Sequence, residues 1–85
     1  MLSAVTEQRL SRRQRVFKAG KISFHNDWAD LDCIVRDLSD KGAGLIVENP
    51  ATIPERFTLT VQSSLITQPC RIVWRSANRM GVTFQ

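Results

Sequence analysis

The chain of 85 residues has room for one small domain, and its composition, 42% hydrophobic and 24% charged, is that of a folded protein. No apolar run approaches the ~20 residues that a membrane-spanning helix needs, and the first residues lack the apolar stretch of a secretory signal. The net charge is +4. We therefore expect a cytoplasmic protein that does not act at a membrane.

The positive charge is confined to the start of the chain. Residues 1–21 hold six basic groups and one acid, whereas residues 22–85 hold six basic groups and seven acids. A local positive field of this kind attracts phosphates, but the nearly neutral remainder argues against a broad nucleic-acid-binding face. Residues 1–15 show no sustained apolar pattern and are expected to form a flexible basic arm.

From Val16 onward the pattern predicts β-structure. Six segments rich in β-branched and aromatic residues alternate in polarity and are separated by turn residues. A small domain of six short strands favours a closed antiparallel barrel, because closure removes exposed strand edges. We expect an all-β, six-stranded antiparallel β-barrel over residues 16–85. The predicted strands are 15–24, 31–38, 43–48, 56–62, 70–76 and 80–85.

The parity of the segment 70–76 places three residues in the core. Cys70, Ile72 and Trp74 are predicted to point inward, with the residues between them pointing outward. Cys33 and Cys70 are far apart in the sequence, and the chain has a single histidine, which is too few ligands for a structural zinc site. We expect two buried free thiols and no metal.

The sequence DLSDKG, which follows the second predicted strand, admits two interpretations. Asp37, Ser39 and Gly42 are residue types that build a tight turn, with Gly42 able to adopt a positive φ. Alternatively, a carboxylate and a hydroxyl fixed at a strand end can read a guanine edge, since its N1–H and N2–H groups are donors for an Asp carboxylate. The motif alone does not separate the two.

The basic arm contains one pair of arginines with the spacing RxxxR, Arg9 and Arg13. A planar guanidinium can bind a phosphate in a bidentate fashion, contact guanine O6 and N7, or stack on a base. Chance and solvation also produce such a spacing in a basic arm. Its position ahead of the first strand and of the DLSDKG turn makes the pair stronger evidence for a ligand site than the spacing alone.

Taken together, these motifs resemble the PilZ family. The RxxxR pair, the DxSxxG turn and the closing segments CRIVW (70–74) and GVTF (81–84) follow the family pattern over residues 9–85. The resemblance implies a six-stranded antiparallel barrel and cyclic di-GMP as the ligand. PilZ domains often carry a helix after the last strand, whereas here no long C-terminal helix is expected.

The resemblance also implies which residues bind the ligand. Arg9 and Arg13 would hold phosphates and guanines from the arm, against the turn that contains Asp37, Ser39 and Gly42. Further candidates for ligand contacts are Arg12, Arg15 and Arg75.

From this resemblance we expect a cyclic di-GMP receptor. We do not expect an enzyme, because no GxSxG, HExxH, P-loop or GxGxxG motif is present. Ordering of the arm on ligand binding would change the surface shown to a downstream protein partner. No cofactor besides this ligand is expected, and the protein would be a monomer or weak dimer. Two alternatives stay open: a degenerate PilZ module that binds protein but no nucleotide, and a small basic barrel that binds nucleic acid.

Overall fold

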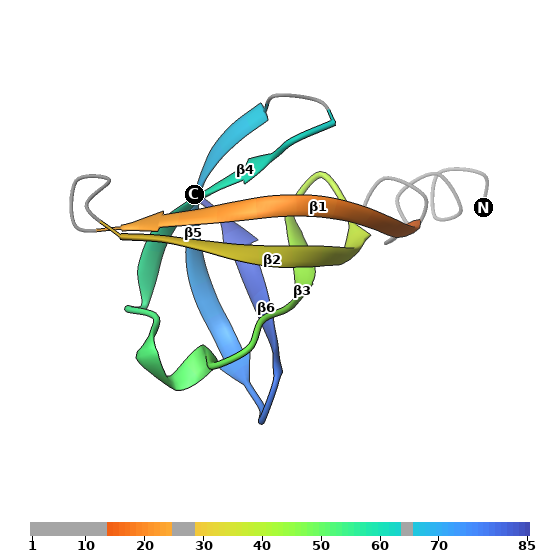
Figure 1. The fold of residues 1–85 in the computed structure, drawn as a ribbon. Coiled ribbons are helices and arrows are strands. Elements are labelled where there is room, and N and C mark those ends of the chain that lie inside the picture. Colours follow the sequence, from red (N-terminus) through yellow and green to blue (C-terminus); the bar gives the residue numbers. More distant parts are fainter. Residues whose placement is uncertain (1–13, 25–28, 64–65) are drawn as a thin grey trace, which may run out of the picture.

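The computed structural model describes residues 14–24, 29–63 and 66–85 (Figure 1). These residues contain no helix with the length and apolar character needed to cross a bilayer. A three-residue 3-10 helix, η1 (Pro50–Thr52), follows β3. The strands are β1 (Gln14–Phe24), β2 (Ala29–Leu38), β3 (Gly42–Ile46), β4 (Arg56–Val61), β5 (Ile66–Arg75) and β6 (Arg79–Phe84).

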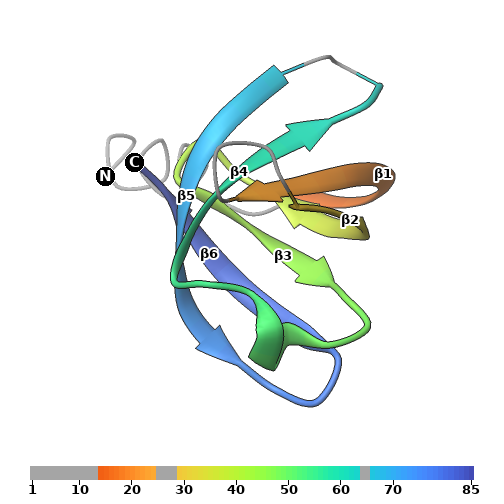
Figure 2. The ribbon, with the colours of Figure 1, turned by 60° about the vertical axis from the view of Figure 1, so that its left-hand side comes forward.

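The six strands form one closed barrel in the order β1-β2-β3-β6-β5-β4, and β1 pairs with β4 to complete it. Every neighbouring pair is antiparallel. Figure 2 looks at the barrel with β4 above β3, β5 running from the top of the view to the bottom, and η1 below the end of β3. The predicted all-β, six-stranded antiparallel barrel is therefore confirmed. β1 begins at residue 14, two residues before the predicted start of the domain.

The core is formed by the apolar residues that alternate along each strand, as the pleat of a β-strand requires. No polar or charged side chain is buried among the described residues. The loop that contains η1 adds Pro50 and Ile53, both buried, which the sequence pattern did not predict. The buried hydrophobic residues are Ile22, Cys33, Val35, Ala43, Leu45, Val47, Ile53, Phe57, Leu59, Val61, Cys70, Ile72, Met80 and Val82.

The inward placement predicted for Trp74 is wrong. The register of β5 on β6 shifts between Ile72 and Trp74, because Val73 is an extra residue without a partner on β6. Such a β-bulge reverses the parity of the residues that follow it. Trp74 consequently lies on the outer face, with 44% of its surface exposed, beside Val73 with 60% exposed.

β5 also begins at Ile66, four residues before its predicted start. The predicted strand began just after Pro69, a residue that cannot donate to a β-ladder. The structure accommodates Pro69 at the position where β6 ends, and its carbonyl accepts a hydrogen bond from the Gln85 amide (2.9 Å). The pairing of β5 with β6 runs from Cys70 to Arg75, so Pro69 lies just outside it.

Burial of the two cysteines gives the barrel a dependence on alkaline pH. Cys33 and Cys70 are free thiols, as predicted. Desolvation by burial raises the pKa of each from 9.0 to about 12, and the nearby charge of Asp32 contributes further at Cys33. The folded state therefore holds these protons more tightly than the unfolded state, so stability is full below about pH 9 and falls as the pH rises toward 12.

We expect the thermal midpoint to decrease from about pH 8 to about pH 10.5, and to decrease less in a Cys33→Ala/Cys70→Ala variant. The quantity compared is the difference between the thermal midpoints at about pH 8 and at about pH 10.5 within each protein. The midpoints themselves are not compared, because removing buried thiols lowers the midpoint at every pH. An identical decrease in the two proteins would assign the alkaline sensitivity to other groups. Circular dichroism melts at both pH values measure this directly.

Candidate ligand-binding surface

Two β-bulges turn a carboxylate and an indole onto the same outer face of the barrel. In β2, Arg36 is an extra residue between the paired positions Val35 and Asp37. Val35 is fully buried, so Asp37 would also point into the barrel if the strand continued without the bulge. The equivalent irregularity in β5 turns Trp74 outward.

The strand registers place Asp37 and Trp74 in one row that runs across the barrel wall. Arg15 on β1 lies opposite Asp37, and Asp37 lies opposite Gly44 on β3. Gly44 pairs with Gly81 on β6, which in turn lies opposite Trp74 on β5. Neighbouring strands are about 4.8 Å apart, so the row brings residues from five strands together over a short distance.

Two glycines form the floor of this row. A Cβ atom at Gly44 would lie 2.5 Å from Oδ2 of Asp37, and one at Gly81 would lie 2.6 Å from Cε2 of Trp74. The carboxylate and the indole therefore lean over the two glycines toward each other. Directly paired residues have Cβ positions about 5 Å apart, so one small ligand can contact both groups.

The turn at the end of the row is held by Ser39. Its Oγ accepts hydrogen bonds from the amides of Lys41 (3.1 Å) and Gly42 (3.2 Å), while its own amide donates to the Gly42 carbonyl (2.9 Å). Gly42 is needed for close packing and not for a positive φ, because a Cβ there would collide with the carbonyl oxygen of Val82. Part of the DxSxxG motif thus has a structural role.

A hollow of about 280 Å³ adjoins the turn. Ser39, Gly42 and Trp74 all contribute to its wall, which joins the predicted turn to the outward indole. Arg71 lies opposite Thr83, the partner of Gly42, so a guanidinium stands on the same side of the barrel. The full lining is Ser39, Lys41, Gly42, Val73, Trp74, Val82 and Thr83.

The predicted site residues have different placements in the structure. Asp37, Ser39 and Gly42 lie together at the β2–β3 connection, and Arg15 lies beside them on β1. Arg75 is directed elsewhere: its Nη1 donates to the carbonyls of Pro50 and Ile53, both at 2.6 Å, at the end of β3 that is remote from the turn. Three predicted arginines lie outside the described residues: Arg9, Arg12 and Arg13.

Sequence reasoning missed Trp74, Gly44 and Gly81 as parts of this surface. A signal was present, since Gly44 and Gly81 interrupt two strands where a side chain would normally be found. No three or more His, Cys, Asp or Glu side chains of the described residues gather to form a metal site. The surface instead combines a carboxylate, an aromatic face and nearby guanidinium groups.

Replacing Gly81 by alanine is expected to displace the indole of Trp74 while leaving the barrel folded. The added methyl group would meet a side chain that is 44% exposed and can move into solvent, and not backbone. We expect a thermal midpoint within a few degrees of the parent, with a changed tryptophan fluorescence spectrum. A Trp74→Phe variant measures the fluorescence of the other tryptophan, Trp28, which is subtracted from both spectra. An unchanged Trp74 spectrum in Gly81→Ala would contradict the contact between Trp74 and Gly81.

The structure is a small, closed antiparallel barrel with a carboxylate and an indole on its outer face. Residues 7–85 match the model of the PilZ domain, and the chain belongs to the PilZ family. PilZ domains are binding and effector domains that generally bind cyclic di-GMP. No curated protein matches this chain.

A solved structure supports the same fold assignment. It is the crystal structure of the PilZ domain of CeSA from a cellulose-synthesizing bacterium, with a TM-score of 0.68 and 16% sequence identity. The match covers 88% of this chain and 81% of that chain. At this identity the similarity establishes the shared barrel.

Proposed function

We propose that this chain is a cyclic di-GMP receptor whose ligand lies on the outer face, over the row from Arg15 to Trp74. The observation that carries the proposal is the pair of bulges, which turn Asp37 and Trp74 out of the barrel and over two glycines. Turning an indole away from a hydrophobic core exposes a large apolar surface to water. Stacking against a base would cover that surface.

Asp37 is suited to recognise guanine. Its carboxylate is partly exposed at the end of β2 and can accept from the N1–H and N2–H donors of the Watson–Crick edge. Adenine presents an acceptor at N1, which an Asp carboxylate would repel. The proposed role of Asp37 therefore predicts a preference for cyclic di-GMP over cyclic di-AMP.

Trp74 and the neighbouring guanidinium groups would complete the contacts. The indole offers a flat face for a base, an interaction worth about 1–3 kcal/mol per base in single-stranded nucleic-acid complexes. Arg15 stands at the β1 end of the row, and Arg71 precedes Trp74 on β5, so both can neutralise phosphate charge. The surface thus matches a ligand with both bases and phosphates.

The arginine pair of the arm completes the proposal. Gln14, the first described residue, lies opposite Leu38, next to the turn. Arg9 and Arg13 are proposed to close over the bound ligand and to bind its phosphates and guanines. Ordering of this segment would then present a new surface to a protein partner.

Calorimetric titration with cyclic di-GMP tests the function. We expect micromolar or tighter binding by the intact chain, and a loss of about tenfold or more in Arg9→Ala and in Arg13→Ala, since each removes charged hydrogen bonds. Lys21→Ala is the matched control, because it removes a basic residue that pairs with Asp32 (3.2 Å) away from the row. The absence of binding by the intact chain would refute the proposal.

A further inference from the structure

A second hollow lies at the end of β2 that is remote from Asp37. The ladder between β2 and β3 ends at the pair Ile34–Ile46. The residue after β3, Val47, donates its amide to the Asn78 carbonyl (3.0 Å) in the turn between β5 and β6. The chain after β3 therefore leaves β2, and a groove opens between them.

This groove leaves one edge of β2 without a neighbour. From residue 29 to residue 33, β2 pairs with β1 on one side. Of the residues that the structure describes, none pairs with β2 on the other side over the same range. A strand edge of this kind offers backbone hydrogen bonds to an added strand.

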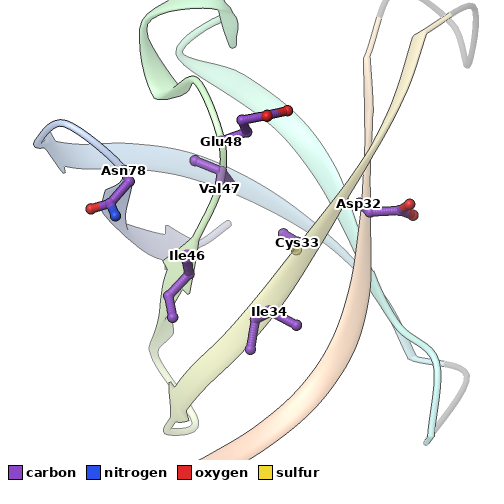
Figure 3. A pocket seen from close by; sticks show the side chains of 7 residues that line it. All are labelled: Asp32, Cys33, Ile34, Ile46, Val47, Glu48 and Asn78. Atoms are coloured by element: carbon purple, nitrogen blue, oxygen red, sulfur yellow. The ribbon is translucent and has the colours of Figure 1, made fainter.

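The walls of the groove are largely apolar, and one acid, Glu48, points over its opening. The cavity has a volume of about 470 Å³, within the range of ligand-binding pockets. Ile34 and Ile46 lie side by side, and Cys33 lies between β2 and the segment that follows β3 (Figure 3). A partner with apolar side chains would find a matching surface here.

The acidic residues in the groove, and Asp30 beside it, differ in whether they have a partner. Asp32 points to the far side of β2, where it pairs with Lys21 (3.2 Å), and Asp30 accepts a hydrogen bond from Ser23 (2.9 Å). Glu48 is exposed and points over the opening toward β2 (Figure 3), and no described residue pairs with it. A cationic side chain of a partner would therefore meet Glu48.

From these features, we propose that the groove binds an extended, basic segment of a partner protein, which adds as a strand to β2 between residues 29 and 33. Its apolar side chains would pack on Ile34 and Ile46, and a Lys or Arg would pair with Glu48. This interaction is separate from the nucleotide surface, since Asp37 lies four positions beyond Cys33 on the same strand. The barrel could thereby hold a nucleotide and a polypeptide at once.

The probe is a short peptide of alternating lysine and valine, with a matched peptide of alternating glutamate and valine. In a titration followed by NMR, we expect the lysine peptide to shift the amide signals of residues 31–34 and 46–48, and the glutamate peptide to bind more weakly. Two further lysine peptides carry N-methyl groups on alternate backbone nitrogens, one on the odd-numbered and one on the even-numbered positions. Only every second amide of an added strand faces β2, so at least one of these two peptides should lose binding. That loss would show that the contact is made by strand pairing.

Charge reversal at the rim gives the decisive comparison. Glu48→Lys is expected to weaken binding of the lysine peptide about fivefold, the upper range for an exposed ion pair, and to favour the glutamate peptide. Glu55→Lys, an exposed acid outside the groove, makes the same change in charge and should leave the preference unaltered. Equal binding of the two peptides, shifts confined to other surfaces, or no effect of Glu48→Lys would overturn the proposal. Titration of cyclic di-GMP tests the nucleotide surface independently.

Discussion

Replacing Gly42 by alanine is expected to lower the free energy of unfolding by about 1–3 kcal/mol, and to weaken any ligand bound at the turn. The added Cβ would collide with the carbonyl oxygen of Val82 and lie 3.2 Å from the Cα of Thr83. Both are backbone atoms of β6 and cannot move without disturbing the ladder between β3 and β6. Urea denaturation of the variant and the parent measures the difference.

Gly44→Ala is the matched control for this prediction. It makes the same chemical change two residues away in β3, but the new Cβ would meet the carboxylate of Asp37 and not backbone. Because a partly exposed side chain can rotate away, we expect a smaller loss of stability from Gly44→Ala than from Gly42→Ala. If the two variants unfold at the same urea concentration, the contact between Gly42 and β6 is not the cause.

Replacing Asp37 by alanine is expected to weaken cyclic di-GMP binding about tenfold to a hundredfold. The estimate corresponds to about 1.5–3 kcal/mol for hydrogen bonds to a charged group. The same change should reduce the preference for cyclic di-GMP over cyclic di-AMP, because the carboxylate is the proposed acceptor for the guanine donors. Calorimetric titration of both nucleotides into the parent and the variant gives both quantities.

Asp40→Ala provides the comparison for Asp37→Ala. Asp40 is an exposed acid in the same turn, so its removal changes the net charge equally without touching the row over the glycines. We expect Asp40→Ala to bind cyclic di-GMP with nearly parental affinity. Equal losses in the two variants would point to the charge of the turn, and tight binding of cyclic di-AMP by the parent would contradict the role given to Asp37.

The barrel was predictable because its information lies in local alternation. Residues such as Leu45 and Leu59 occupy the inward parity that the sequence suggested, and both are buried. Alternation cannot reveal a bulge, because a single extra residue leaves the apolar pattern before it intact. Alternation therefore predicts a buried Trp74, two positions after Ile72, whereas the bulge at Val73 turns it outward.

The candidate site was predictable only in part. The family motif located Asp37, Ser39 and Gly42. Which of them stabilises the turn and which faces the ligand surface depends on contacts between strands that are distant in the sequence. Ser39 caps the amides of its own turn, whereas Asp37 lies over Gly44, a partner that only the register of β2 on β3 identifies. The roles of Gly44 and Gly81 became visible once the strands were paired.

The two bulges suggest how such a surface could be gained or lost over evolutionary time. Asp37 and Trp74 face outward because β2 contains one residue more than β3 at Arg36, and β5 contains one residue more than β6 at Val73. Deleting Arg36 or Val73 would rotate the following residue toward the interior without substituting any member of the motif. A related sequence could therefore retain every motif residue and yet lack the surface, so relatives of this chain are better sorted by strand length than by motif residues alone.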